Sequence, residues 1–183
     1  MNCCVIESMG VTMDLSLFTS LEGRISRQKL WLGAFVLMIA IFVVFFVLRI
    51  IFGVSVVSTI DATMSPEGIA AVVRKLTMLS IAVLIVFVYP ISALMKKRLN
   101  DRDRPAWYMY VFWAPTAINL LLSLAGMTYT MAEVGGVMVP VSTTAGWLIG
   151  LAGLVIGIWA LVELGFLRGT NGSNRHGPDP LAT

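Results

Sequence analysis

The residues best suited to chemistry in this 183-residue sequence lie in three short polar segments between long apolar stretches. The segments cover 23–27, 98–101 and 169–180, and their candidate functional residues are Arg24, Arg27, Arg98, Asp101, Asn174, Arg175 and Asp179. A guanidinium group presents forked N–H donors that pair bidentately with a carboxylate or a phosphate. These residues therefore allow two interpretations. One is a structural latch of paired arginines and aspartates, which we favour, and the other is a pocket for an anionic head group, a phosphate or an acidic segment of a partner.

Catalysis is not indicated by these residues. The sequence has one histidine, His176, and no motif for an activated nucleophile, a metal-spaced cluster or a phosphate-binding loop. Cys3 and Cys4 are adjacent, and no other cysteine is available to pair with them. The basic segments are short for a nucleic-acid surface. We therefore expect no enzymatic activity, no cofactor, no metal ion and no nucleic-acid partner.

The composition indicates a membrane protein. Hydrophobic residues make up 58% of the chain and charged residues 13%, and the mean hydropathy is +0.89. A soluble protein this apolar could not cover its surface with polar groups, whereas lipid requires no such covering. Four apolar stretches reach the ~20 residues needed to cross a bilayer; they cover about 30–52, 76–95, 107–127 and 147–167. The predicted fold is all-α, a bundle of four transmembrane helices.

The distribution of lysine and arginine predicts the orientation of this bundle. Ten of these residues lie before the first span, between the second and third, or after the fourth, whereas Arg49, Arg74 and Lys75 lie at the opposite ends. The positive-inside rule places the ten in the cytoplasm, and an even number of spans then puts both termini there. We predict a cytoplasmic segment over 1–23, a transmembrane domain over 24–168 and a cytoplasmic tail over 169–183. No secretory signal is recognisable before the first span.

The fourth span carries a stripe of small residues. Gly146, Gly150, Gly153 and Gly157 recur at spacings of four and three, which aligns them along one helix face. Small residues let helix backbones approach closely in lipid. The stripe predicts packing against a helix of the same chain, contact in a homodimer, or the wall of a substrate path, in that order of preference.

Two polar residues interrupt the predicted spans. Glu163 lies about one turn inside the end of the fourth span, where an unpaired carboxylate is costly. We expect it to pair with Arg168 or with an arginine of the inner loop, rather than to relay protons. Asn119 lies near the middle of the third span, where an amide usually hydrogen-bonds a neighbouring helix.

The two outer segments differ in character. Ser65-Pro66-Glu67 has an N-cap residue, a proline at the first helical position and a carboxylate in the first turn. It predicts a short helix that merges into the second span. The segment 128–146 is apolar but rich in turn residues, including Gly135-Gly136 and Pro140. It could lie on the membrane surface or dip partly into it.

Motifs at the ends of the spans resemble a known family. They are Phe18, Gly23-Arg24-Ile25-Ser26-Arg27 and Trp31, then Arg98-Leu99-Asn100-Asp101 and Trp107, then Gly169, Gly172, Asn174-Arg175-His176-Gly177 and Asp179-Pro180. In this order they are similar to the "domain of unknown function 805" family of small bacterial inner-membrane proteins, over roughly residues 13–181. Asn100 replaces the family's usual histidine and His176 its usual aromatic residue. The resemblance implies the location and the topology, with residues 1–12 as an extension before the family's usual start, and it implies no activity.

Taken as a functional prediction, the sequence favours a structural, interaction or lipid-binding protein of the membrane. The alternative is a small transporter or channel that acts as an oligomer. Transport normally requires polar residues along one face of a span, but only Asn119 and Glu163 interrupt the deep parts of the spans. The expected partners are membrane lipids and either a second copy of the chain or another membrane protein.

Overall fold

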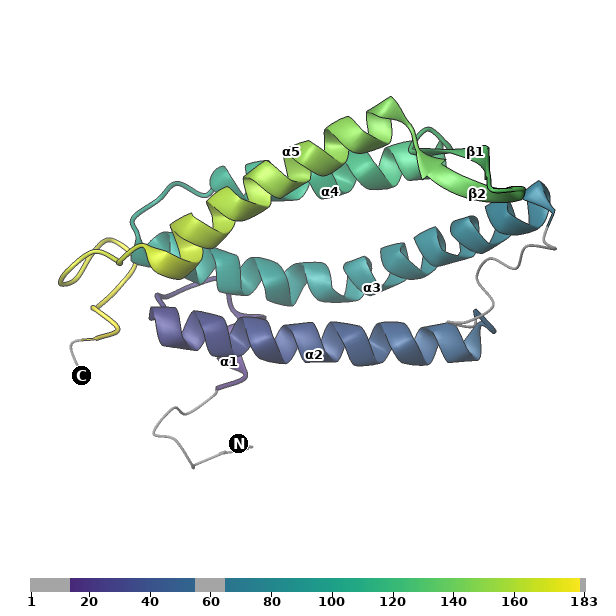
Figure 1. Ribbon diagram of the computed structural model, residues 1–183. Coiled ribbons are helices and arrows are strands. Elements are labelled where there is room, and N and C mark those ends of the chain that lie inside the picture. Colours follow the sequence, from purple (N-terminus) through teal and green to yellow (C-terminus); the bar gives the residue numbers. More distant parts are fainter. Residues whose placement is uncertain (1–13, 55–64, 182–183) are drawn as a thin grey trace. The chain divides into compact units, whose positions relative to one another are not determined.

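The chain is mostly helical, as the sequence predicts. The structure, a computed structural model, describes residues 14–54 and 65–181, so the predictions for Cys3, Cys4 and residues 1–12 lie outside the described residues (Figure 1). In chain order the elements are α1 (Ser16–Thr19), α2 (Arg27–Ile51), α3 (Pro66–Asp101), α4 (Tyr108–Leu124), β1 (Tyr129–Val134), β2 (Val137–Ser142), α5 (Thr144–Ala160) and the π-helix η1 (Leu161–Phe166).

Among the described residues, three helices are long and apolar enough to cross a membrane: α2, α3 and the continuous helix Thr144–Phe166 formed by α5 and η1. The helix α4 is also apolar but has only 17 residues. Many large apolar side chains on these helices are exposed, including Phe42 and Tyr110. Water would not tolerate so much contiguous apolar surface, whereas lipid does. The chain therefore has the properties of a membrane protein.

The helix α4 ends three residues before the predicted limit of the third span because of a glycine cap. Gly126 adopts a left-handed conformation with φ +70°, and the Met127 amide donates to the Leu122 carbonyl oxygen at 2.9 Å. This is a Schellman motif, which ends a helix by satisfying its last carbonyl groups.

The second predicted span is part of a longer helix. The Gly68 amide donates to the Ser65 hydroxyl at 3.2 Å, and Pro66 is the first residue of α3. The predicted merger of an outer helix with the second span is therefore confirmed. At its other end α3 continues to Asp101, six residues beyond the predicted limit of the span at residue 95. Arg98 and Asp101 consequently lie on a helix rather than in a loop.

The segment 128–146 corrects the all-α prediction, because it contains a β-hairpin. Strands β1 and β2 pair antiparallel from Tyr129↔Ser142 to Val134↔Val137. Gly135 and Gly136 form the two-residue turn with φ +62° and +81°. Two successive residues with positive φ form the type I′ turn, whose twist matches that of the paired strands. The hairpin gives the conformation of this segment, and its predicted position on or partly in the membrane stays a prediction.

The stripe of glycines in α5 is not uniformly packed. A Cβ atom at Gly146 would lie 2.4 Å from the Thr128 carbonyl oxygen, and one at Gly153 would lie 3.7 Å from Pro115 Cβ. A Cβ atom at Gly150 or Gly157 would meet nothing within 4 Å. Only half of the stripe therefore contacts other parts of the described chain.

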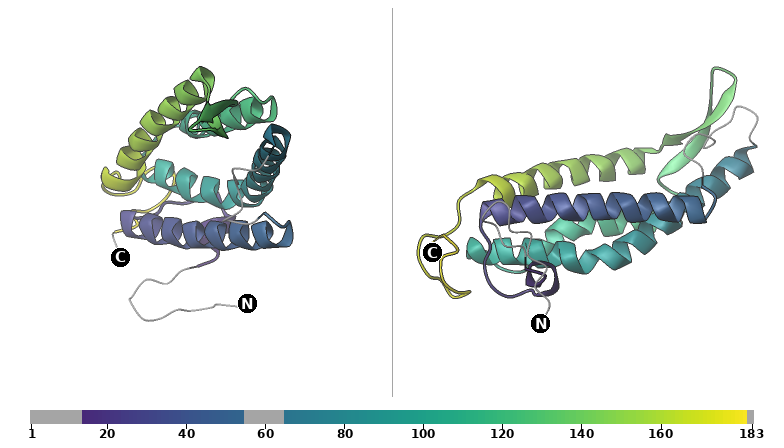
Figure 2. Two further views of the ribbon diagram at one scale, coloured as in Figure 1. Left: turned by 45° about the vertical axis from the view of Figure 1, so that its right-hand side comes forward. Right: turned by 90° about the horizontal axis from the view of Figure 1, so that it is seen from below.

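The chain divides into two compact units. The first contains the described residues of 14–40, 86–111 and 157–181, and the second contains those of 41–85 and 112–156. All three polar segments identified in the sequence belong to the first unit. Within that unit, the start of α2 and the C-terminal segment lie at the same end, as three views show (Figures 1 and 2).

The apolar packing of the first unit fixes α1 against α2 and α3. A Cβ atom at Gly33 of α2 would lie 2.9 Å from Leu94 Cδ2 and 3.2 Å from Leu17 Cδ2, so only glycine fits without displacing these side chains. Leu17, Leu94 and Leu99 are all buried. This contact positions the polar segment 23–27, which lies between α1 and α2.

Candidate functional site

Asp101, the last residue of α3, lies between two arginines. Arg24 Nη2 is 3.0 Å from Asp101 Oδ1, and Arg98 Nη1 donates to Asp101 Oδ2. The side chains of both arginines are 1% exposed and that of Asp101 is 4% exposed. Arg98 and Asp101 share a helix face at spacing i, i+3. Each carboxylate oxygen therefore receives one guanidinium group.

The remaining donors of Arg24 bind the C-terminal segment. Its Nη1 donates to the carbonyl oxygens of Gly172 at 2.8 Å and Gly177 at 3.2 Å, and its Nη2 donates to the Thr170 carbonyl and hydroxyl oxygens at 2.8 and 3.2 Å. With Asp101 Oδ1, five oxygen atoms surround this side chain. An arginine has five N–H donors, so the number of acceptors matches the number of donors.

Arg98 joins three parts of the first unit. Its Nε donates to the Leu164 carbonyl oxygen at 2.8 Å, its Nη1 to the Ile25 carbonyl oxygen at 3.3 Å, and its Nη2 to the Leu167 carbonyl oxygen. A buried guanidinium is tolerated when its charge and its donors are both satisfied. We refer to Arg24, Arg98, Asp101 and Thr170 as the Asp101 cluster.

The C-terminal end of the helix formed by α5 and η1 is capped by side chains of other elements. Consecutive carbonyl oxygens from 163 to 167 accept hydrogen bonds as follows: Glu163 from Arg102, Leu164 from Arg98, Gly165 from Trp31, Phe166 from Arg27, and Leu167 from Arg98. The last carbonyls of a helix lack partners within it and form the negative end of its dipole. Cationic donors at this position satisfy both requirements.

Glu163 is buried and pairs with arginines of the segment after α3. Its Oε1 lies 3.2 Å from Arg102 Nε and 2.9 Å from Arg104 Nε. Of the two kinds of partner expected from the sequence, the structure has the inner-loop arginines and not Arg168. The paired carboxylate lies within η1, where its backbone carbonyl is also occupied by Arg102 at 3.1 Å.

The C-terminal segment closes over Asp101 through its own polar groups. The Thr170 amide donates to the Asp101 carbonyl oxygen at 2.9 Å, and Asn174 Nδ2 donates to the Asn100 carbonyl oxygen at 3.0 Å. A Cβ atom at Gly169 would lie 2.0 Å from Asp101 Oδ2, so this position has no room for a side chain. The segment is thus fitted to the end of α3.

Comparison with models of protein families assigns the chain to a family. A family model described as "Protein of unknown function (DUF805)" matches residues 18–178. The chain belongs to the DUF805 family. The match covers the first two polar segments and residues 169–178 of the third, and the resemblance found in the motifs is confirmed. No curated protein and no solved structure matches the chain.

Asn100 replaces the histidine usual in DUF805 proteins, and it is bonded on one side only. Its Nδ2 donates to the Gly23 carbonyl oxygen at 3.1 Å, whereas its buried Oδ1 has no hydrogen-bond partner within the described residues. Histidine could also donate there, so the contact with Gly23 does not require asparagine. The second departure, His176, has a pKa lowered chiefly by burial and then by nearby Arg175.

Four candidate residues of this DUF805 chain lie outside the Asp101 cluster: Arg27 and Asn174, which bind Phe166 and Asn100 as described above, and Asp179 and Arg175. Asp179 accepts hydrogen bonds from the amides of Gly172 and Leu181, each at 2.9 Å, and these bonds lower its pKa. It forms no ion pair within the described residues, so it orders the C-terminal segment and does not hold an arginine. Arg175 forms an exposed ion pair of 2.7 Å with Asp103.

Asp103 shows why the segment after α3 turns where it does. It is the only non-glycine residue with positive φ among the described residues, at φ +55°, and the Arg104 amide donates to the Leu99 carbonyl oxygen at 2.9 Å. Asp103 thus takes the place that glycine usually occupies in a helix C-cap. The turn directs Arg102 and Arg104 toward Glu163.

The remaining polar candidate of the predicted spans, Asn119, is not brought to this site. It lies in the second unit, its side chain is exposed, and it makes no hydrogen bond within the described part of the chain. The expectation that it bonds a neighbouring helix is therefore not met by these residues. The described residues also contain no group of three or more potential metal ligands of the His, Cys, Asp and Glu types.

Proposed function

We propose that this DUF805 protein is a structural or interaction protein of the bacterial inner membrane, with four spans and both termini in the cytoplasm. In this proposal the Asp101 cluster is a latch. It joins the segment before α2, the end of α3 and the C-terminal segment into one cytoplasmic face, which partners or lipids contact.

The occupancy of the arginine donors carries this proposal. The N–H donors of Arg24 already have five oxygen acceptors from Asp101 and the C-terminal segment, and its side chain is 1% exposed. A phosphate or head group at this position would have to displace the protein's own acceptors. The arrangement therefore favours the latch over an anion pocket built on the same arginines.

The distribution of charge supports the proposed orientation. The basic residues assigned to the cytoplasm belong to the first unit, whereas Arg49, Arg74 and Lys75 belong to the second. The proposed third span is α4. Its 17 residues rise about 26 Å, slightly less than the thickness of a ~30 Å hydrocarbon core. Exposed Trp107 and Tyr110 at its start suit the interface between lipid and water.

The transporter alternative has less support. Glu163, the carboxylate best placed for a proton relay, is paired with two arginines. Asn119 is exposed and is not accompanied by a polar face on α4, whose sequence is otherwise dominated by apolar residues.

Two experiments test the proposal. Reporter fusions at Glu67, at Glu133 and at the C-terminus should place the first two outside and the last inside, and an external C-terminus would overturn the orientation. For the latch, inside-out vesicles are treated with a protease of broad specificity. The variant Arg24→Gln should release the C-terminal segment for cleavage, whereas Arg175→Gln, which removes the same charge from an exposed pair, should leave it protected. Equal cleavage of the two variants would refute the latch.

A further inference from the structure

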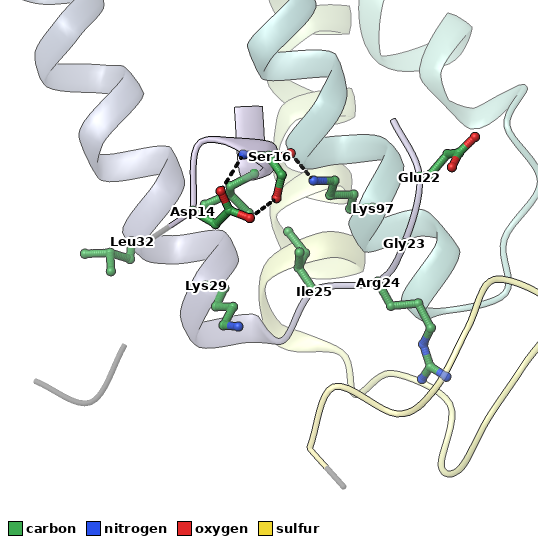
Figure 3. A pocket seen from close by; sticks show the side chains of 10 residues that line it. Asp14, Ser16, Glu22, Gly23, Arg24, Ile25, Lys29, Leu32 and Lys97 are labelled. Atoms are coloured by element: carbon green, nitrogen blue, oxygen red, sulfur yellow. Dashed lines mark hydrogen bonds between the residues drawn. The ribbon is translucent and has the colours of Figure 1, made fainter. Parts of the chain in front are cut away.

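A pocket beside the Asp101 cluster is lined by both charged and apolar side chains. It has a volume of about 400 Å³, within the range typical of small-molecule sites, and is formed by α1, the segment before α2, the start of α2 and the end of α3 (Figure 3). Its lining residues are Asp14, Ser16, Leu17, Glu22, Gly23, Arg24, Ile25, Lys29, Leu32 and Lys97. Apart from Arg24, and from Ile25 through its carbonyl oxygen, these residues make no hydrogen bond with the Asp101 cluster.

The position of α1 places this pocket at the depth of lipid head groups. Lys97 Nζ donates to the Ser16 carbonyl oxygen, and the Tyr89 hydroxyl donates to the Thr19 carbonyl oxygen at 2.9 Å. Lys97 and Tyr89 are eight residues apart on α3, which corresponds to a rise of about 12 Å. Because Tyr89 lies within the predicted second span, α1 reaches from the polar end of α3 into the apolar zone.

The pocket is lined by three cationic side chains, Arg24, Lys29 and Lys97, and by two carboxylates, Asp14 and Glu22. Lys97 is 5% exposed, and its one hydrogen bond, to the Ser16 carbonyl oxygen, leaves two of its three N–H donors without a partner within the described residues. A buried ammonium group in that state favours an anion nearby. Lys29 is exposed and forms no ion pair within the described residues. Arg24 is already occupied by Asp101 and the C-terminal segment.

Neither carboxylate of the lining forms an ion pair with Lys29 or Lys97 within the described residues. Both oxygens of Asp14 accept hydrogen bonds from Ser16, from its amide at 3.2 Å and its hydroxyl at 2.8 Å, although Asp14 and Lys97 still attract each other over a longer distance. Figure 3 shows the carboxylate of Glu22 at the far side of the pocket, directed away from the Lys97 ammonium. Leu17, Ile25 and Leu32 supply an apolar wall.

We propose that this pocket binds the phosphate group of a phospholipid from the cytoplasmic leaflet. Lys29 and Lys97 supply the positive charge, and Leu32 contacts the glycerol backbone and the first acyl carbons. A free phosphate ion would satisfy the lysines but would leave the apolar wall without a ligand. This inference rests on the membrane insertion and orientation stated under the proposed function, and it does not depend on the latch.

The test is native mass spectrometry of the purified full chain titrated with phosphatidylglycerol. Lys29→Gln should bind this lipid about fivefold more weakly, the effect of removing one charge near the head groups. Lys96→Gln is the matched control, because Lys96 neighbours Lys97 on α3 but does not line the pocket. Leu32→Trp should also weaken binding, because it fills the pocket without changing a charge.

Two further ligands test separately whether the phosphate group and the apolar part of the lipid contribute to binding. Diacylglycerol, which lacks the phosphate, should bind more weakly than phosphatidylglycerol to the unmodified chain and equally to the unmodified chain and Lys29→Gln. Inorganic phosphate should not displace the lipid. Equal weakening by Lys29→Gln and Lys96→Gln would overturn the proposal, as would displacement of the lipid by inorganic phosphate. Because these variants leave the Asp101 cluster intact and the reporter fusions test orientation separately, failure here is distinguishable from failure of the proposed function.

Discussion

The substitution Asp101→Asn should destabilise the protein more than the same change at an exposed carboxylate. It removes the negative charge that Arg24 and Arg98 share but keeps the size of the side chain. Both guanidinium groups are 1% exposed, so neither can recover its hydration without disrupting its contacts with backbone carbonyls. The amide group of asparagine would also direct N–H donors at one of the arginines.

The expected magnitude follows from the burial of the pairs. Removing one partner of a buried ion pair costs about 3–5 kcal/mol because a buried charge is left uncompensated. Here two such charges depend on one carboxylate, which places the expected loss of unfolding free energy at the upper end of that range. For a chain of this size each kcal/mol corresponds to a melting temperature change of about 2–4 °C, so the expected decrease is about 8–20 °C.

The assay is thermal unfolding in detergent, followed by the fluorescence of tryptophan, including Trp31 against the end of η1. Asp103→Asn is the matched control: it is the same chemical change two residues away, in an exposed pair worth about 0–1 kcal/mol. The side chains of that pair, Arg175 and Asp103, are 60% and 45% exposed. If Asp101→Asn melts within about 2 °C of this control, the arginines do not require the carboxylate and the reasoning is wrong.

Three other predictions concern the backbone and the pH dependence. Gly169→Ala should lower the melting temperature markedly because its Cβ would lie 2.0 Å from Asp101 Oδ2, whereas Gly150→Ala, with nothing within 4 Å, should be neutral or stabilising. Gly135→Asn should preserve the hairpin, since Asn-Gly suits a type I′ turn, and Gly135→Val should disrupt it as measured by circular dichroism. The lowered pKa of His176 means that the fold favours neutral imidazole, so stability should be full above pH 6.5 and fall as the pH drops toward the folded-state pKa. His176→Phe should remove that part of the slope when the melting temperature is measured against pH.

Hydropathy and helix-capping residues predicted the helices because both signals depend only on residues that are neighbours along the sequence. The apolar stretches set the approximate limits of the helices, and Ser65-Pro66 marked the start of α3. The hairpin was missed although its signal was present: Gly135-Gly136 joins two short valine-containing runs. In an apolar segment, alternation between polar and apolar residues is absent, so periodicity does not separate a strand from a membrane-associated loop.

The sequence predicted which residues form the site better than it predicted which groups these residues bind. Arg24, Arg98 and Asp101 meet because their motifs lie at helix ends of the same unit. Asp179 instead accepts backbone amides, as aspartates in turns often do, and residue types alone do not distinguish this from an ion pair. The carbonyl cap at 163–167 was missed because backbone acceptors have no sequence signature. The surplus of arginines over carboxylates in the polar segments is the one feature that could have indicated it.

The contacts of Arg24 also bear on how the protein is made. Arg24 binds the carbonyl oxygen of Gly177, which is separated from it by 153 residues along the chain. At about 5–20 residues per second, synthesis of that stretch lasts roughly 8–30 s. Throughout this interval Arg24 lacks its C-terminal acceptors, and a nascent chain that stops early never acquires them. In a product truncated within the helix Thr144–Phe166, Arg24 therefore keeps Asp101 but permanently lacks its acceptors at Thr170, Gly172 and Gly177.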